Sequence, residues 1–162
     1  MVSFKGFKKW LTARKQELEI QNLAIGMNSS IDISEDLHIV MLDYDVKDIE
    51  KVTESVWEVQ EFWGLADADI FRTKNGYHVF FWYDHVPYER VKMIVNFAKY
   101  VDPMFKYISR YYNHKTIRVS GKYAHRDIWF VKHVEGVRAP ENQEFELGHM
   151  KKAEHAQFVR QF

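Results

Sequence analysis

Two aspartates separated by one residue, Asp43 and Asp45, carry the strongest chemical signal in this chain. They follow an apolar run at residues 39–42 that is typical of a buried β-strand. Residues two apart in a strand point to the same face, so the two carboxylates are expected side by side. Carboxylate oxygens are the ligands that hard divalent cations prefer. The pair therefore predicts half of a metal site, and the alternative is that it only ends the strand and caps the next helix.

The hydrophobic periodicity around this pair predicts the elements that must position it. In chain order they are strand 38–46, helix 47–63, strands 69–73 and 77–83, a helix opened by Pro87, and strands 115–120 and 128–134. Asn75 and Gly76 form a hairpin signal between the second and third strands. The order β-α-β-β-α-β is the ferredoxin-like arrangement that RNA-recognition modules also use.

The whole chain, residues 1–162, is predicted to be one α+β domain with its ferredoxin-like core at about 36–134. An added helix is predicted over residues 3–24, and the strand at 128–134 is extra to the ferredoxin-like set. The polar tail at 140–162 is predicted to end in a helix. In this arrangement the first strand lies between the third and the fourth, with the helices on one face.

A single register places five polar side chains on the face opposite the helices. On the three neighbouring strands, the apolar residues that alternate with them are expected to be buried. The residues sent to this face are Asp43, Asp45, His78, Arg118 and Ser120. Their convergence is a stronger signal than any one of them alone.

Two acids, a histidine and an arginine on one face suit metal-assisted phosphoryl transfer. The carboxylates would hold one or two divalent ions, and His78 and Arg118 would bind phosphate oxygens. A two-metal site usually needs a third carboxylate. Asp102 is the leading candidate for it and Asp127 the reserve.

Three short stretches, in this order, resemble the archaeo-eukaryotic primase superfamily, especially the primase-polymerases of plasmids, viruses and mobile elements. The first is hydrophobic-Asp-x-Asp at residues 41–45, and the second is a turn followed by Gly-Tyr-His and apolar residues at 74–81. The third is hydrophobic-Asp at 101–102, followed by Ile-Arg-hydrophobic-x-Gly at 117–121.

The resemblance implies a metal-dependent nucleotidyltransferase that initiates or extends strands on a single-stranded DNA template. It implies that Asp43, Asp45 and Asp102 are catalytic and bind Mg²⁺ or Mn²⁺. It also implies that His78 contacts the phosphates of the incoming nucleoside triphosphate and that Arg118 contacts the nucleotide or the template. The zinc-binding cysteines and helicase domains of larger relatives are missing here, so a separate helicase or accessory primase subunit is an expected partner.

Three further polar residues are expected close to the nucleotide. Lys74 lies in the hairpin turn, Ser120 on the strand of Arg118, and Lys122 in the basic loop that follows Gly121. A solvated turn or loop is the structural alternative for both lysines.

Composition limits the kind of partner. The 23 lysines and arginines balance the 23 aspartates and glutamates, so any site for a polyanion must be a local patch. The absence of cysteine excludes disulfides and thiolate metal sites. No signal-peptide core and no apolar run long enough for a bilayer is present, so an intracellular, cytoplasmic protein without a membrane partner is expected.

Two other functions remain open. A replication-initiator endonuclease would use a tyrosine near a lysine, for which Tyr111, Tyr112 and Lys115 are candidates. The metal motif of that class has two histidines, however, and the corresponding stretch of this chain supplies only His78. A primase relic that binds single-stranded nucleic acid without catalysis is the third hypothesis, although Asp43 and Asp45 would repel phosphate without a bound metal.

Overall fold

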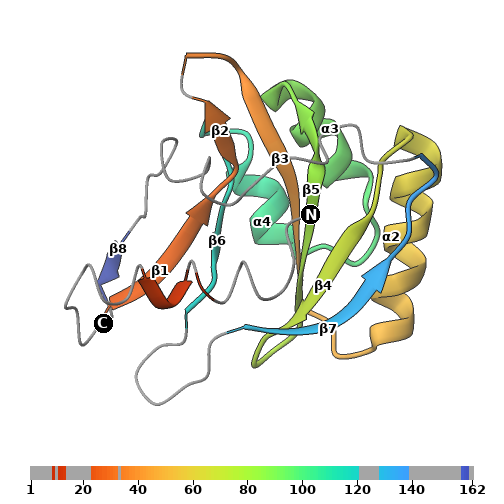
Figure 1. Cartoon of the computed structure of the whole chain (residues 1–162), viewed down its shortest axis with the longest axis horizontal. Coiled ribbons are helices and arrows are strands. Elements are labelled where there is room, and N and C mark those ends of the chain that lie inside the picture. Colours follow the sequence, from red (N-terminus) through yellow and green to blue (C-terminus); the bar gives the residue numbers. More distant parts are fainter. Residues whose placement is uncertain are drawn as a thin grey trace.

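The computed structural model describes residues 9, 11–13, 23–32, 34–120, 128–138 and 158–160. Over these residues the chain is an α+β protein with an open five-stranded antiparallel sheet, a smaller three-stranded sheet and packed helices (Figure 1). The larger sheet has the strand order β2-β3-β5-β4-β7, and the smaller sheet has the order β6-β1-β8. The prediction of an α+β domain is confirmed at this level.

The elements have the following bounds. The strands are β1 (Leu23–Asn28), β2 (Ser30–Asp32), β3 (Leu37–Tyr44), β4 (Ala68–Arg72), β5 (Tyr77–Val86), β6 (Thr116–Arg118), β7 (Trp129–Val134) and β8 (Phe158–Arg160). The helices are α2 (Ile49–Trp63), α3 (Tyr88–Phe97) and α4 (Pro103–Ile108).

The helix after β3 begins and ends where its sequence requires. The Asp48 side chain accepts hydrogen bonds from the first free N–H groups of α2, and Gly64 ends the helix in the left-handed conformation at φ +65°. Helices α2 and α3 lie side by side against the larger sheet (Figure 1). The Tyr44 hydroxyl lies 3.0 Å from the Ser55 hydroxyl of α2, so Tyr44 faces the helices as expected.

The hairpin between β4 and β5 lies directly against the end of β3. The predicted turn is present, and its Gly76 packs so closely that an added Cβ would come within 1.8 Å of the Tyr44 carbonyl oxygen. Only glycine allows this approach of two backbones. The turn that carries Lys74 is therefore held beside the strand end that carries Asp45.

The expected ferredoxin-like order is met for three strands, since β3, β5 and β4 are neighbours in that order. The fourth strand is not where that arrangement puts it. Strand β6 pairs with β1 in the smaller sheet, and β2 occupies the edge beside β3. Ser29, between β1 and β2, links β3 to the residue before β6. Its N–H donates to the Lys115 carbonyl oxygen, and its carbonyl oxygen accepts from the Ile39 N–H.

Three local predictions are also corrected. The helix expected over 3–24 gives way to strand at Leu23, because β1 finds pairing partners in β6 and β8. The tail contributes strand β8 at 158–160, where a helix was expected, and the remainder of 140–162 lies outside the described residues. The stretch between α3 and β6, for which no element was expected, contains α4, which Asp102 caps and Pro103 opens.

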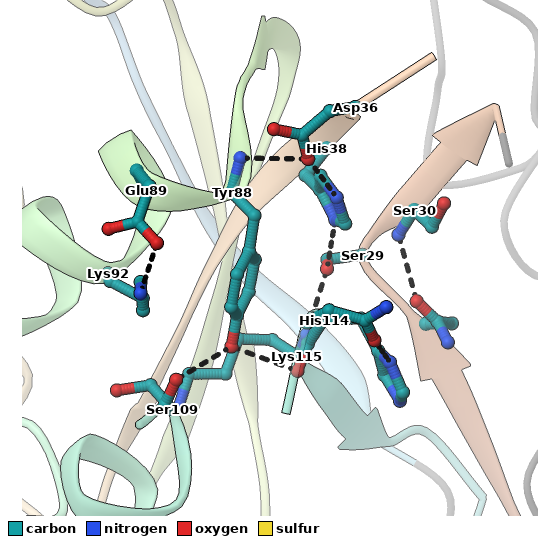
Figure 2. A network of polar contacts seen from close by, with 12 residues as sticks. Ser29, Ser30, Asp36, His38, Tyr88, Glu89, Lys92, Ser109, His114 and Lys115 are labelled. Carbon is teal, nitrogen blue, oxygen red and sulfur yellow. Dashed lines mark hydrogen bonds and ion pairs between the residues drawn. The ribbon is translucent and has the colours of Figure 1, made fainter. Parts of the chain in front are cut away.

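A buried polar network joins the two sheets (Figure 2). The Ser29 hydroxyl accepts a hydrogen bond from the Lys115 N–H at 2.9 Å and lies 2.9 Å from Nδ1 of His38. Burial lowers the pKa of His38, which favours the neutral ring that accepts from Ser29 and donates to Asp36 at 3.1 Å. Because Ser29 is fully buried, this serine–histidine–aspartate chain ties strands together and presents no accessible nucleophile.

Candidate functional site

Asp43 and His78 form the centre of the site. They are directly opposite each other on the paired strands β3 and β5, and Nε2 of His78 lies 3.3 Å from Oδ1 of Asp43. The Asp43 side chain is 33% exposed and that of His78 is 9% exposed. The alternation of the two strands thus brings these predicted partners together on the face opposite the helices, as expected.

The second ring nitrogen of His78 takes no part in this contact. Its Nδ1 is buried and has no hydrogen-bond partner among the residues that the structure describes. A buried polar nitrogen without a partner is rare in folded proteins and requires an explanation. A ligand or water at this atom would satisfy it.

Asp102 comes next to Asp43 through the main chain. Val101 bridges to Tyr44, and the Asp102 N–H donates a 2.8 Å hydrogen bond to the Asp43 carbonyl oxygen. The Asp102 carboxylate itself accepts a 3.0 Å hydrogen bond from the Met104 N–H at the start of α4. The predicted third carboxylate therefore belongs to a residue whose main chain contacts Asp43, and one of its oxygens caps a helix.

Lys115, which the sequence suggested only as a lysine near a nucleophilic tyrosine, is buried within electrostatic reach of Asp43 and Asp102. Its side chain is 2% exposed, its Nζ donates to the Phe105 carbonyl oxygen, and it lies 3.8 Å from the centre of the Phe105 ring. Burial lowers the pKa of Lys115 to about 8, although the charges of Asp43 and Asp102 oppose that shift. A positive charge is thus built in beside the two acids.

A signal for Lys115 was present in the sequence. It alternates in phase with Ile117 and Val119, which were expected to be buried and are buried. A lysine in phase with a buried set indicates a buried cation, and buried cations require nearby acceptors or acids.

Asp45 and Lys74 lie at the solvent-facing rim of the site. Both are exposed, with Asp45 one residue beyond the end of β3 and Lys74 in the turn that Gly76 holds against that end. Asp45 therefore lies beyond the end of the strand that carries Asp43, and only Asp43 is paired with His78.

The remaining predicted residues separate from this centre. Arg118 is exposed on β6, which belongs to the smaller sheet and not to the sheet of Asp43. Ser120 is 4% exposed, so it does not lie on an open surface as expected. Lys122 and the reserve carboxylate Asp127 lie outside the described residues.

The donor set fits a divalent ion that is held jointly with a substrate. Among the described residues, no three His, Cys, Asp or Glu side chains are placed to enclose one ion. Mg²⁺ usually binds proteins through one or two carboxylates and takes its other ligands from water and substrate phosphates. Asp43 and Asp102, with Asp45 at the rim, offer that kind of partial site.

A second acid–histidine cluster on β4 and β7 does not offer one. Both ring nitrogens of His133 are engaged, at 2.7 Å to Asp69 and 3.0 Å to Asp67. Asp69 also accepts from the Trp82 ring and Asp67 from the Gly136 N–H. Burial lowers the pKa of His133, but the two carboxylates more than offset this and raise it overall. The cluster is satisfied internally and ties β7 to β4.

Comparison with protein-family models, curated protein sequences and solved structures gives no match for this chain. Within the part of the chain that the structure describes, no helix combines the length and apolar character needed to cross a membrane. The assignment of function therefore depends on the geometry of the site.

Proposed function

We propose that the protein is a metal-dependent nucleotidyltransferase of the primase-polymerase kind, which initiates or extends strands on single-stranded DNA inside the cell. The observation that carries the proposal is the convergence of Asp43, His78 and Asp102, which come from three separate stretches of the chain. These are the three stretches in which the sequence resembles the archaeo-eukaryotic primase superfamily. The order β3-α2-β4-β5-α3 supports a ferredoxin-like catalytic half, with β3, β5 and β4 adjacent in the sheet.

Each residue has a role in this proposal. Asp43 and Asp102, with Asp45 at the rim, would hold Mg²⁺ or Mn²⁺ jointly with the substrate, and the ion would neutralise triphosphate charge and activate the attacking hydroxyl. His78, which Asp43 holds through Nε2, would contact a phosphate oxygen of the incoming nucleotide. Lys74 at the rim supplies a further positive charge for phosphate.

The substrates and partners follow from this chemistry. They are nucleoside triphosphates, a single-stranded DNA template, and a separate helicase or accessory primase subunit that loads the template. Replication of a plasmid, virus or other mobile element is the setting that the resemblance favours. The neutral net charge supports a metal-bridged nucleotide site over a surface that binds DNA by charge alone.

The test is nucleotide incorporation on primed and unprimed single-stranded DNA with Mg²⁺ or Mn²⁺, using ribo- and deoxyribonucleotides in parallel. The double variant Asp43→Asn plus Asp45→Asn is expected to lower incorporation to background, because the shape is kept and the charge is lost. Glu61→Gln, which changes an exposed carboxylate on α2, is the matched control and should retain activity. Incorporation that survives in the double variant would show the metal assignment to be wrong.

Asp102→Asn separates the two uses of that side chain. Asparagine caps helices as well as aspartate does, so α4 and the thermal stability should be preserved. Loss of incorporation with unchanged stability is the expected result if Asp102 binds the metal. Full activity would restrict Asp102 to its capping role.

A second candidate function is a single-strand-binding protein without catalysis. The observation that favours it is Lys115, whose built-in charge lies within electrostatic reach of Asp43 and Asp102 and partly neutralises them without a metal. Metal-independent binding of single strands without nucleotide incorporation would select this function. A covalent tyrosine–DNA product would instead select the initiator endonuclease.

A further inference from the structure

A cavity of about 320 Å³ lies between α4, β6 and β1, beside the acidic site. Phe105 and Ile108 of α4 line it together with Tyr112, and Thr116 and Arg118 line it from β6. Its volume falls at the lower end of the range of small-molecule sites. The cavity is therefore large enough for one ring-bearing ligand.

The lining has a one-sided charge. Lys115 and Arg118 contribute positive charge, His114 also lines the cavity, and no lining residue within the described part of the chain is acidic. The chain as a whole has a formal net charge of zero, so this is a local concentration of positive charge. Positive charge at the edge of an apolar cavity suits a ligand that joins a ring system to an anion.

The cavity also offers groups that its own residues leave unused. The Thr116 hydroxyl oxygen is buried and has no hydrogen-bond partner among the described residues. Tyr112 is 57% exposed and Ile108 is 41% exposed, although both are large apolar side chains. An aromatic ring that stacks on Tyr112 would cover this surface.

Lys115 connects the cavity to the acidic site. It lines the cavity, and its charge is within electrostatic reach of Asp43 and Asp102. Asp102 caps α4, the helix that supplies Phe105 and Ile108. A ligand in the cavity would therefore lie against the lysine whose charge acts on Asp43 and Asp102.

We propose that this cavity binds the base and sugar of a nucleoside phosphate, with the ring against Tyr112 and the phosphate beside Arg118. The inference rests on the proposed function and extends it, since it assigns a base-binding role to residues outside the acidic site. The nucleotide is either a free triphosphate or one unit of a single strand, because both present the same ring and phosphate.

The test is isothermal titration calorimetry in EDTA, with ATP, adenosine, inorganic triphosphate and a short oligothymidylate as probes. Tyr112→Ala and Arg118→Ala are each expected to weaken nucleotide binding about tenfold, through lost stacking and lost phosphate contact. Ile108→Trp, which fills the cavity from a partly exposed position, should weaken it at least as much. Tyr107→Ala is the control, since Tyr107 is an exposed tyrosine of α4 that does not line the cavity.

The results separate the outcomes clearly. Tighter binding of ATP assigns the cavity to the incoming nucleotide, and tighter binding of oligothymidylate assigns it to a strand. Inorganic triphosphate that binds as tightly as ATP would overturn the inference, and so would equal weakening by Tyr107→Ala and Tyr112→Ala.

The cavity and the proposed function can fail independently. The calorimetry needs neither metal nor turnover, so the cavity can be demonstrated in a protein that incorporates no nucleotide. Conversely, incorporation by wild type with an unchanged KM for nucleotide in Tyr112→Ala and Ile108→Trp would reject the cavity and leave the proposed function standing.

Discussion

Lys115 shows how a single residue sets the electrostatics of the site. Its ammonium group is buried and bonded to a backbone carbonyl, and among the described residues no carboxylate is recorded in an ion pair with it. Burial disfavours its charged form, and the more distant Asp43 and Asp102 compensate only in part. The protein therefore keeps a lysine of low pKa beside two acids.

This lysine predicts a pH dependence of stability. The pKa is about 8 in the folded chain and 10.5 ordinarily, so the folded state binds fewer protons between these values. The free energy of unfolding should then rise with pH from 8 to 10.5, by up to about 3 kcal/mol from this group. Below pH 8 the destabilisation caused by burying the charged lysine is fully present.

Chemical denaturation in EDTA across pH 7 to 10.5, with Lys115→Met beside wild type, measures this contribution. As the pH rises, the free energy of unfolding of wild type should increase relative to that of Lys115→Met. Lys51→Met, at an exposed position on α2, is the control and should show a constant difference. A constant difference for Lys115→Met as well would mean that Lys115 has an ordinary pKa.

At the scale of elements, the hairpin turn and the end of β3 depend on one close contact. Gly76 has no Cβ, and this lets the β4–β5 turn lie on the backbone of Tyr44. The contact fixes where Lys74 and Asp45 lie relative to the paired Asp43 and His78. The geometry of the rim is thus set by a backbone contact and not by the polar side chains themselves.

Gly76→Ala is expected to lower the free energy of unfolding by about 1–3 kcal/mol, because the new Cβ meets a backbone oxygen that cannot move freely. Gly64→Ala is the matched comparison, since a Cβ there meets no atom within 4 Å and only the left-handed φ of +65° is unfavourable. That change should lower stability by about 1 kcal/mol. Thermal unfolding of both variants checks the ranking, and a neutral Gly76→Ala would contradict the close contact.

At the scale of the whole molecule, Ser29 links the two sheets. Its backbone bonds to Lys115 and Ile39. Its hydroxyl bonds to Lys115 and His38 (Figure 2). The smaller sheet carries Arg118 and one wall of the cavity, and the larger sheet carries Asp43 and His78. The relative position of the acidic site and the cavity therefore depends on this junction.

Ser29→Ala is expected to lower the free energy of unfolding by about 1–3 kcal/mol, because it leaves the Lys115 N–H and the His38 ring without their buried partner. Amide hydrogen exchange should show faster exchange at Lys115, while amides within α2 change only with global stability. Ser30→Ala, at the next and less buried position, is the control. Unchanged protection of Lys115 would show that the hydroxyl does not hold the sheets together.

The sequence by itself determined the local pattern of the larger sheet. Alternation with period two placed Asp43 and His78 on one face of their strands, and the Asn-Gly turn joined β4 to β5. Asp48, which caps the N-terminus of α2, and Gly64, which ends the helix, likewise set its limits. These features depend on residues close together in the chain, so local rules are enough to predict them.

Only the tertiary structure decided which strand lies beside β3, how Asp102 reaches Asp43, and that the buried Lys115 lies against Phe105 of α4. The expected helix over 3–24 included the first two residues of β1, and the strand itself was not predicted, because its partners β6 and β8 are distant in sequence. An edge of a sheet accepts any strand that can supply hydrogen bonds, so long-range packing selects the partner. The acids and the histidine could thus be named from the sequence, whereas the main-chain contact that brings Asp102 to Asp43, the surroundings of Lys115 and the cavity required the folded chain.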